Sequence, residues 1–397
     1  MTKLDELIQE LCPDGVKYLP IPELFITRNG YTPSKANNEF WENGTIPWFR
    51  MEDIRENGRI LTTATQYVSE KAVKGKLFPA DSIIIATSAT IGEHALIKVP
   101  SLANQRFTYL TLKDEFKDCV DMMFVFYYCF RLDEYCKSHL NQGNFASVDM
   151  KQFAAFKFPV PPLPVQREIV RILDNFTELT AELTAELTAR KQQYAYYRDK
   201  LLTFGDVRVG VTSDVIRRTL GEVCKISAGG DAPKDSMSKQ KTEKYSVPII
   251  SNGIGENALY GYTDAPKVEE PAVTVAARGT IGYAEYRDYP FYPIIRLLTA
   301  IPKDSTVVNT KYLYYCLQGK QYSVPIGGIP QLTAPELKKV EIPIPSLDVQ
   351  NRIVQVLDNF DAVCTDLSSG LPAEIEARQK QYEYYRDKLL TFREISN

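Results

Sequence analysis

Two stretches of fifteen residues decide the fold: RKQQYAYYRDKLLTF, from Arg190 to Phe204, and RQKQYEYYRDKLLTF, from Arg378 to Phe392, which are identical at 12 of 15 positions. A second matched pair lies upstream, where PVPPLPVQREIVRILDNF from Pro159 and PIPSLDVQNRIVQVLDNF from Pro343 agree at 11 of 18 positions. Long internal repeats indicate an architecture directly, because each copy is one structural unit. The chain is therefore predicted to contain two copies of one plan.

Each copy predicts a long helix after its proline-rich start, beginning at about Leu163 and Leu347. Apolar residues then recur by alternating steps of four and three, which is the spacing of a coiled-coil seam. The first seam is Ile169, Leu173, Phe176, Thr180, Leu183, Leu187, Arg190, Tyr194, Tyr197 and Leu201. The second is Ile353, Leu357, Phe360, Cys364, Leu367, Leu371, Ile375, Arg378, Tyr382, Tyr385 and Leu389.

The second seam contains four extra residues. The offset between the copies is 350 − 166 = 184 for one block and 378 − 190 = 188 for the other. The insertion falls in LSSGLPAEIEA, where Gly370 is expected to end one helix and Pro372 to lie in the first turn of the next. We therefore expect the second helix to be broken there.

The run TAELTAEL, from Thr180 to Leu187, is interpreted as an adjustable spacer. Four residues add about 6 Å to a helix and keep the leucines near one face. The alternative is that Ala, Glu and Leu simply form a strong helix.

A second apolar face recurs outside the seams and is predicted to bind another protein, with packing on the chain's own domains as the alternative. Its residues are Val170, Ile172, Leu179, Tyr196 and Leu202, repeated as Val354, Val356, Val363, Tyr384 and Leu390.

Two segments between the helices, about 18–158 and 217–342, have short apolar runs broken by Gly, Pro and Asn, and we call them the first and second heads. IIATSATIG from Ile84 matches TVAARGTIG from Thr274, and Arg106 matches Arg296 at the same offset of 296 − 106 = 190. Elsewhere the heads diverge. Two similar helical blocks that carry two different heads favour a protein that reads a site made of two different parts. The predicted domains are 1–158, 159–204 (first helical spacer), 205–342 and 343–397 (second helical spacer).

Composition leaves the partner open. The net charge is −3 and 44% of residues are hydrophobic, which is typical of a globular protein and neutral on nucleic acid. The N-terminal segment lacks the basic-then-apolar order of a signal peptide. The longest apolar run, Met122–Phe130, is too short to span a membrane, so we expect a cytoplasmic protein. Seven cysteines without a C-x-x-C pair indicate reduced thiols and no metal site.

The paired VQ-x-x-IV-x-x-LDNF and YYRDKLLTF blocks, the TAEL repeats and the TIG skeleton resemble the specificity subunit of type I restriction-modification enzymes, in the subfamily with TAEL repeats. The resemblance implies an α+β fold, with two mixed α/β target recognition domains joined by two long antiparallel coiled-coil helices in a pseudo-twofold repeat. It implies a non-catalytic subunit that reads a bipartite, asymmetric site in double-stranded DNA. The implied partners are two modification (methyltransferase) subunits and the motor-nuclease restriction subunits. No cofactor is expected in this chain, with S-adenosylmethionine, ATP and Mg on the partner subunits.

Direct readout needs Arg or Lys for guanine and Asn or Gln for adenine, with other polar groups for phosphates. The candidates in the first head are Arg50, Thr87, Ser88, Thr90, Asn104, Gln105, Arg106, Asn144 and Ser147. Those in the second are Asn252, Asn257, Arg278, Thr280, Arg296 and Gln331. Ser147 and Gln331 come from matched glycine loops, QGNFAS from Gln142 and IGGIPQ from Ile326.

Catalysis by this chain is not supported. His94 and His139 lie in no triad or metal spacing, and no phosphate-binding G-x-x-x-x-G-K-[ST] loop is present. SNGIGENALY, from Ser251, is predicted to be a turn, and Glu336 with Lys338 gives only an E-x-K fragment of a nuclease motif. The alternatives to a DNA reader are a coiled-coil protein-interaction scaffold that does not bind DNA and, more remotely, a nuclease.

Overall fold

The computed structural model describes residues 2–141, 146–204, 215–322, 330–366 and 368–395. The chain forms two compact units, the first made of residues 1–182 and 376–397 and the second of 183–375. The divisions fall inside two helices, at 182/183 in α6 (Leu163–Thr203) and at 375/376 in α11 (Leu371–Leu389). Each unit therefore contains one head and a pair of helical segments.

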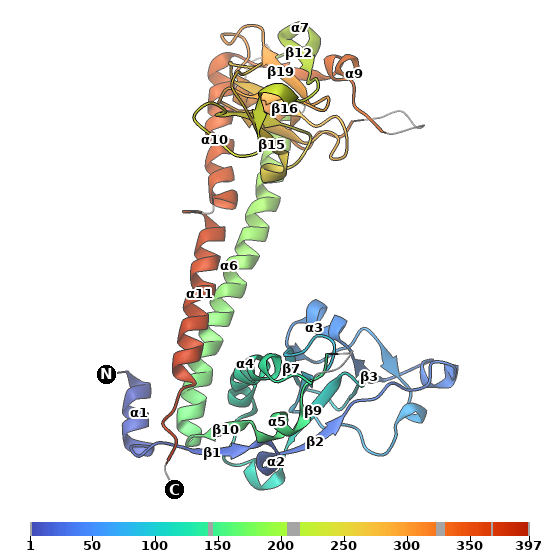
Figure 1. Cartoon of the computed structure of the whole chain (residues 1–397), viewed down its shortest axis with the longest axis vertical. Coiled ribbons are helices and arrows are strands. Elements are labelled where there is room, and N and C mark those ends of the chain that lie inside the picture. The colour runs from blue at the N-terminus through green and yellow to red at the C-terminus, as the bar shows by residue number, and fades with distance from the viewer. Residues whose placement is uncertain (1, 142–145, 205–214, 323–329, 367, 396–397) are drawn as a thin grey trace. The chain divides into compact units, whose positions relative to one another are not determined.

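The first unit is a mixed α/β domain (Figure 1). Its helices are α1 (Lys3–Leu11), α2 (Ile21–Leu24), α3 (Met51–Asn57), α4 (Met122–Ser138) and α5 (Met150–Ala155), with the first part of α6 and most of α11. Its strands are β1 (Lys17–Pro20), β2 (Phe25–Asn29), β3 (Ile46–Phe49), β4 (Ile60–Leu61), β5 (Tyr67–Val68), β6 (Ser82–Ala86), β7 (His94–Ile97), β8 (Leu102–Ala103), β9 (Phe107–Leu112) and β10 (Lys157–Val160).

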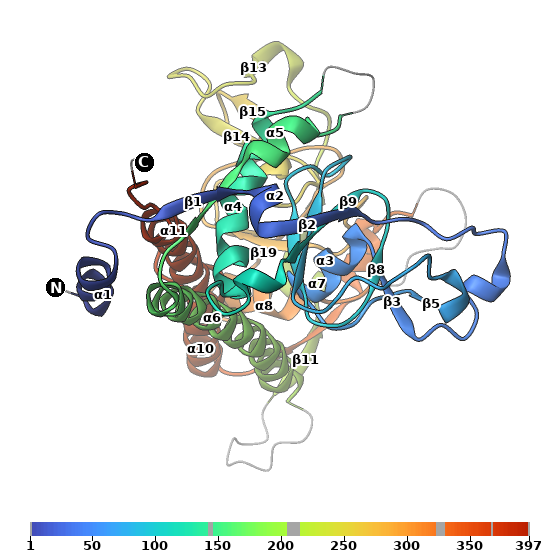
Figure 2. The ribbon, with the colours of Figure 1, turned by 90° about the horizontal axis from the view of Figure 1, so that it is seen from below.

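The strands of the first head form a five-stranded sheet in the order β2-β9-β6-β7-β4 and a three-stranded sheet in the order β5-β3-β8. All five residues of β6 are buried, because successive side chains point to opposite faces and both faces are covered. Ile83 and Ile85 pack in the core that contains α4, whereas Ile84 packs in the core that contains β3. Figure 2 shows β2 and β9 side by side, as their antiparallel register requires.

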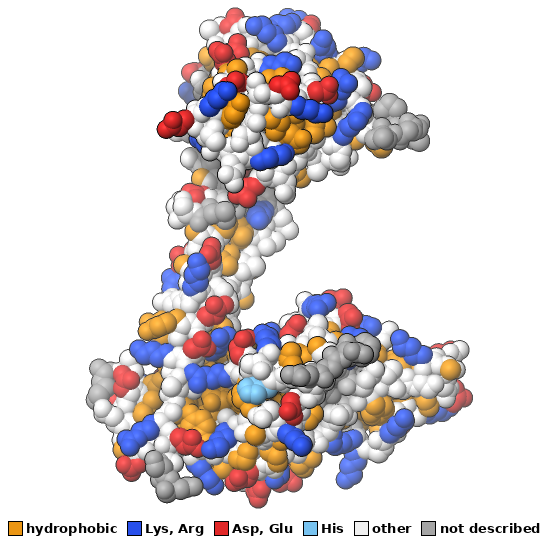
Figure 3. All heavy atoms as spheres, viewed as in Figure 1, with side chains coloured by type: hydrophobic (Ala, Val, Ile, Leu, Met, Phe, Trp, Pro, Cys, Tyr) orange, Lys and Arg blue, Asp and Glu red, His pale blue; other side chains and the backbone are white. Residues whose placement is uncertain are grey.

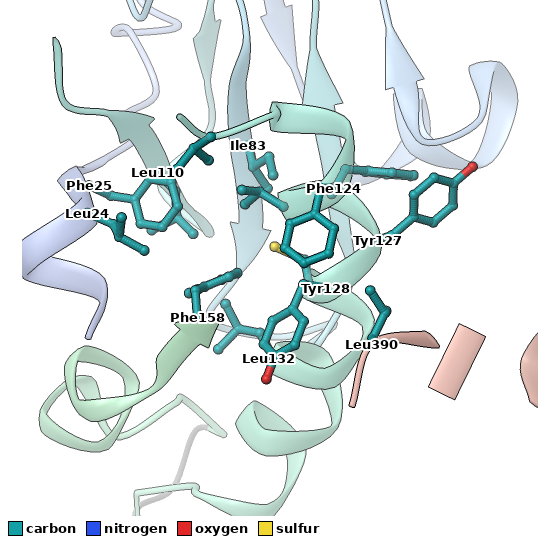
Figure 4. Close-up of a cluster of buried hydrophobic side chains, with 14 of the residues drawn as sticks. Leu24, Phe25, Ile83, Leu110, Phe124, Tyr127, Tyr128, Leu132, Phe158 and Leu390 are labelled. Carbon is teal, nitrogen blue, oxygen red and sulfur yellow. The ribbon is translucent and has the colours of Figure 1, made fainter. Parts of the chain in front are cut away.

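Helix α4 connects the sheet to the long helices of the first unit. In the close-up of the core (Figure 4), Tyr128 of α4 lies beside Phe158, with ring centroids 5.3 Å apart, and Phe158 packs in turn on Phe25 at 5.3 Å. On α6, Phe176 stacks on Tyr385 of α11, with ring centroids 5.5 Å apart. The two helices run antiparallel within this unit (Figure 1).

The second unit repeats this plan. Its strands are β11 (Ile216–Thr219), β12 (Cys224–Ala228), β13 (Met237–Ser238), β14 (Val247–Ile250), β15 (Leu259–Thr263), β16 (Ala272–Val275), β17 (Ala284–Arg287), β18 (Tyr292–Pro293), β19 (Leu298–Pro302) and β20 (Glu341–Ile344). Its helices are α7 (Leu220–Val223), α8 (Thr310–Leu317), α9 (Ala334–Lys338) and α10 (Leu347–Thr365), with the rest of α6.

The sheets show the internal repeat. The order β12-β19-β16-β17 in the second head corresponds to β2-β9-β6-β7 in the first. In both heads a short parallel pair lies in the other sheet, β3 with β8 in the first head and β14 with β18 in the second. The stack of Phe176 on Tyr385 also has a counterpart, because Tyr197 of α6 stacks on Phe360 of α10 at 6.0 Å. The predicted α+β class, with two mixed heads and paired helices, is confirmed.

The break in the second helix is also confirmed, since α10 ends at Thr365 and α11 begins at Leu371. The Asp366 carboxylate accepts hydrogen bonds from the hydroxyl and N–H of Ser368, at 2.6 and 2.7 Å, and these lower the pKa of Asp366. A Cβ on Gly370 would lie 2.7 Å from the carbonyl oxygens of Ala362 and Asp366, so only glycine fits this turn. Pro372 is the second residue of α11, where a missing N–H costs nothing.

Candidate nucleic-acid interface

Polar residues of the first head meet where β3 and β8 end. These strands are parallel, with Phe49 opposite Ala103, so the residues that follow them lie at one edge. The N–H of Asn104 donates to the carbonyl of Phe49 at 3.0 Å, and Arg50 follows Phe49 directly. The Arg50 guanidinium donates to the Thr65 hydroxyl at 3.0 Å. The structure therefore brings Arg50 and Asn104 together.

The ends of β6 and β8 extend this edge. The N–H of Thr87 donates to the carbonyl of Arg106 at 2.9 Å, and Ser88 forms a bridge with Ser147. The N–H of Val148 donates to the carbonyl of Thr87 at 2.9 Å. Loops from three parts of the sequence therefore meet in one place. We call their predicted residues the first cluster: Arg50, Thr87, Ser88, Asn104, Gln105, Arg106 and Ser147.

Two predicted residues of the first head do not join this cluster as exposed groups. The hydroxyl oxygen of Thr90 is buried and has no hydrogen-bond partner among the described residues, so it cannot reach a duplex as predicted. Asn144 lies outside the described residues. In contrast, Gln105 and Arg106 are both exposed, and the amide oxygen of Gln105 contacts the Thr32 hydroxyl. The exposed amide and guanidinium are therefore the most accessible of the predicted residues in this cluster.

The second head contains the corresponding cluster: Asn252, Asn257, Arg278, Thr280, Arg296 and Gln331. The Arg278 guanidinium donates twice to the Gln331 amide oxygen, at 2.6 and 3.0 Å. The N–H of Leu332 donates to the carbonyl of Ala277 at 2.9 Å, which repeats the contact of Val148 with Thr87. Val148 and Leu332, the residues that follow Ser147 and Gln331, therefore lie at equivalent places in the two heads.

Asn252 holds the loops of this cluster together through its side chain, and its role as a reader of bases stays a prediction. Its amide Nδ2 donates to the carbonyl of Ile295 at 2.5 Å, and its Oδ1 accepts from the N–H of Ala277 at 2.8 Å. The Thr280 hydroxyl in turn donates to the carbonyl of Asn252 at 3.0 Å. Because these groups hold loops together, the exposed Arg278 and Arg296 are the better candidates for base contact.

Sequence reasoning missed the glycines that allow these loops to approach. Gly30 donates its N–H to Phe107 at 2.9 Å, and Gly229 does the same to Leu297 at 2.8 Å. A Cβ on Gly30 would lie 2.2 Å from the carbonyl oxygen of Asn104, which is too close for any side chain. The two glycines are 229 − 30 = 199 residues apart, so a comparison at the offset of 190 does not pair them.

A buried polar pair supports the loop that carries Thr87 and Ser88. His94 is fully buried, and its Nδ1 lies 2.6 Å from Oδ2 of Asp133 on α4. Burial raises the pKa of the Asp133 carboxyl, although His94 and Arg59 act in the opposite direction. Gly92 has a φ of +78°, and a Cβ there would lie 2.6 Å from the carbonyl oxygen of Asp133. This pair anchors the loop on α4.

A buried glutamine connects the start of each long helix to its head. In the first unit, Gln166 accepts from the N–H of Asp121 at 2.8 Å and donates to the carbonyls of Cys119 and Pro161 at 2.8 and 2.7 Å. Gln350 makes the same three contacts in the second unit, with the N–H of Asn309 at 2.9 Å and two carbonyls at 2.8 and 2.9 Å. These contacts explain why glutamine occurs in both VQ-x-x-I blocks.

The aspartates of the LDNF blocks act in the same way. The Tyr127 hydroxyl of α4 donates to Asp174 at 2.6 Å, and the Tyr315 hydroxyl of α8 donates to Asp358 at 2.5 Å. Each long helix is therefore fixed to its own head by a glutamine and an aspartate at equivalent positions.

The predicted outer face of the helices is only partly exposed. Its exposed members are Leu179, Tyr196, Val356, Val363 and Tyr384, of which Tyr196 and Tyr384 are the most exposed at 61% and 62%. Val170 and Leu390 are instead buried in the core of the first unit, so for them the alternative of internal packing holds. Ile172, Leu202 and Val354 are half-buried.

Charged side chains of both signs are interspersed on the face shown in Figure 3. Among the described residues, no group of three or more His, Cys, Asp or Glu side chains could hold a metal ion. Glu336 accepts from the N–H of Thr333 at 2.7 Å and caps α9, and residues 251–260 turn from β14 into β15, as predicted. In the part of the chain described, no helix combines the length and hydropathy needed to cross a membrane.

Comparison with known proteins now adds to this geometry. The family model for the type I restriction modification DNA specificity domain matches residues 13–190 and 212–377. The chain belongs to this family. It is 43% identical over 384 residues to the type I restriction enzyme EcoprrI specificity subunit of Escherichia coli, covering 93% of each chain. It is 32% identical over 285 residues to the EcoR124I/EcoR124II specificity subunit of Escherichia coli, covering 64% of this chain and 68% of that one.

Solved structures of the family share the fold. One from a study of complex assembly and conformational transition of the type I restriction-modification system has a TM-score of 0.66 at 18% identity, over 96% of this chain and 98% of that one. The HsdS subunit from Thermoanaerobacter tengcongensis has a TM-score of 0.54 at 16% identity, over 96% and 97% of the two chains.

Proposed function

We propose that this chain is the non-catalytic DNA-recognition subunit of a type I restriction-modification complex, and that each head reads one half of a bipartite, asymmetric site. The observation that carries the proposal is that both heads contain the same set of main-chain hydrogen bonds, which we call the frame, whereas the side chains at these positions differ. The N–H of Asn104 donates to Phe49 in the first head, and the N–H of Ile294 donates to Ile250 in the second. The frame holds loops in the same way while the residues that face outward differ.

The exposed groups suit readout of base edges. Arg106, Arg278 and Arg296 present guanidinium groups, which form paired hydrogen bonds with guanine in the major groove. Gln331 already orients Arg278 through two hydrogen bonds, so less conformational entropy is lost on binding. Gln105 offers an amide suited to adenine.

The helices bind the partner subunits in this proposal. Tyr196 and Tyr384 occupy equivalent positions and are largely exposed, as a docking surface for one modification subunit at each repeat requires. Two methyltransferase subunits and the motor-nuclease subunits supply the chemistry, and they carry S-adenosylmethionine, ATP and Mg.

Binding measurements with matched arginine variants test the proposal. The chain is purified with its modification subunit, and fluorescence anisotropy measures binding to a DNA duplex. The duplex contains the sequence motif in which the complex methylates adenine, as found by methylation mapping. Arg278→Ala should weaken binding by about 5-fold to 150-fold and relax discrimination in one half-site only, whereas Arg106→Ala should do so in the other. Arg352→Ala is the control, because Arg352 is 80% exposed on α10 outside both clusters.

Salt provides a second criterion. Phosphate contacts make log affinity fall linearly with log salt, by about 0.9 for each contact. A soluble complex that binds no duplex selectively at any salt concentration would refute the proposal and favour a protein-interaction scaffold. Metal-dependent cleavage by the single purified chain would favour a nuclease.

A further inference from the structure

Arg296 of the cluster in the second head and Ile295, which directly precedes it, both have a left-handed backbone. Ile295 has a φ of +53° and Arg296 a φ of +62°. A β-branched residue rarely adopts this conformation, because its Cβ substituents crowd the neighbouring carbonyl. Such strain persists only where the surrounding structure enforces it, and it is concentrated at functional positions.

Main-chain contacts hold Ile295 in this conformation. Its N–H donates to the carbonyl of Gly230 at 2.9 Å, and its carbonyl accepts from the Asn252 amide at 2.5 Å. The residues on either side are tied as well, since Ile294 donates to Ile250 at 2.9 Å and Leu297 to Ile294 at 3.0 Å. The backbone is therefore fixed, and so is the direction of the Ile295 side chain.

The fixed side chain is apolar and remains 47% exposed. It borders a hollow of about 780 Å³ that is lined by residues 231–236, Tyr260 and Ile294. Asn252 connects the carbonyl of Ile295 to the N–H of Ala277, which precedes Arg278. An exposed isoleucine therefore lies among the polar groups assigned to base reading.

The first head places a different side chain on the same frame. The hydrogen bonds of Asn104 and Phe107 repeat those of Ile294 and Leu297, so Gln105 is the counterpart of Ile295. Gln105 is polar and has no positive φ. The second head therefore accepts backbone strain to present an apolar group where the first head presents an amide.

We propose that Ile295 reads a thymine in the second half-site through the 5-methyl group in the major groove. An aliphatic side chain cannot form hydrogen bonds, and the thymine methyl is the apolar feature of a base edge that it can recognise. The neighbouring Arg278 and Arg296 read adjacent bases by hydrogen bonds. This inference rests on the proposed function and assigns one position within it.

Deoxyuridine substitution tests the inference, because deoxyuridine differs from thymidine only by this methyl. Duplexes are made that contain the motif in which the complex methylates adenine. In each duplex one thymidine of the second half-site, on either strand, is replaced by deoxyuridine. Binding is measured with the full chain and its modification subunit. One replacement should weaken binding about fourfold, the factor that corresponds to about 0.8 kcal/mol for one buried methyl-sized group. The Ile295→Ala variant should lose that difference, and Ile295→Val should keep most of it.

Ile216→Ala is the matched control, because Ile216 is 55% exposed on β11 of the same unit. It should show the full deoxyuridine effect. If the wild-type complex binds its motif but no thymine is sensitive, or if the sensitivity survives in Ile295→Ala, the inference is wrong while the proposed function stands. A second half-site without thymine on either strand would also refute it. Failure to bind any motif would instead refute the proposed function.

Discussion

Replacement of Gln166 by methionine should destabilise the first unit by about 3 kcal/mol. The two side chains have similar volumes, so the cavity left is small. The change removes three hydrogen bonds of 2.7 to 2.8 Å to main-chain groups, and the Gln166 side chain is fully buried. Each neutral hydrogen bond contributes about 1 kcal/mol, and a buried group left unpaired costs about 1–3 kcal/mol. Three lost hydrogen bonds therefore lower the free energy of unfolding by about 3 kcal/mol, and a main-chain group left unpaired would lower it further.

Tryptophan fluorescence isolates this effect. Both tryptophans of the chain, Trp41 and Trp48, lie in the first unit, so their emission follows unfolding of that unit. With a urea dependence of about 2 kcal/mol per molar, the transition midpoint should fall by about 1.5 M. The control is Gln9→Met, since Gln9 is exposed on α1 of the same unit. Equal midpoints for the two variants would refute the reasoning that the buried amide stabilises the join between helix and head.

Four further results are expected. Of the seven cysteines only Cys119 is exposed, so a thiol reagent should label one thiol per native chain at pH 8. It should label none in Cys119→Ser. Rapid labelling of three or more thiols would contradict the burial of the other cysteines. Burial raises the pKa of Asp133 above 3.8, so its carboxyl binds a proton more tightly in the folded than in the unfolded chain, and the stability from this difference is lost as pH rises above about 4. As pH is raised from 4.5 to 8, the free energy of unfolding of Asp133→Asn, measured by urea titration, should therefore rise relative to that of the wild type. A fall relative to the wild type over this range would contradict the reasoning. Paired replacement of Tyr196 and Tyr384 by alanine should reduce co-purification of the modification subunit at least tenfold without moving the tryptophan transition, and unchanged recovery would exclude this surface. Deletion of one TAEL unit within residues 180–187 should shorten α6 by about 6 Å and the spacing of the two half-sites by one or two base pairs, whereas changed half-sites with the same spacing would exclude the spacer.

The repeated helical blocks could be predicted from sequence because each position has a local physical reason. The alternating steps of four and three bury Ile169 and Leu173 in one unit and Leu357 in the other. The helix break followed equally from residue types, since Gly370 fits a turn that no other residue can occupy. Sequence spacing alone was sufficient for these features.

The recognition clusters were predicted less completely, because their geometry depends on contacts between distant residues. Residue type suggested that Asn252 reads bases, but its amide holds two loops that are 43 and 25 residues away. The strained backbone at Ile295 has no signal in a sequence, since a β-branched residue is rarely found at a positive φ. Composition favours polar candidates, so nothing in the sequence was a reason to consider an apolar residue at this position.

The outer face of the helices shows the same limitation. Tyr196 and Tyr384 are exposed as the pattern predicted, whereas Leu390, taken from the same pattern, is fully buried. Leu390 lies directly after the last residue of α11 and packs in the core that contains α4, a contact that the repeat pattern alone does not show.

Methylation mapping tests the central claim most directly. A plasmid is sequenced by long reads after propagation in a host that expresses this chain with its modification subunit. The account predicts one split, asymmetric motif with a methylated adenine in each half, and Arg278→Ala should alter only one half. A soluble complex that methylates no split motif would contradict the claim that the two heads read DNA.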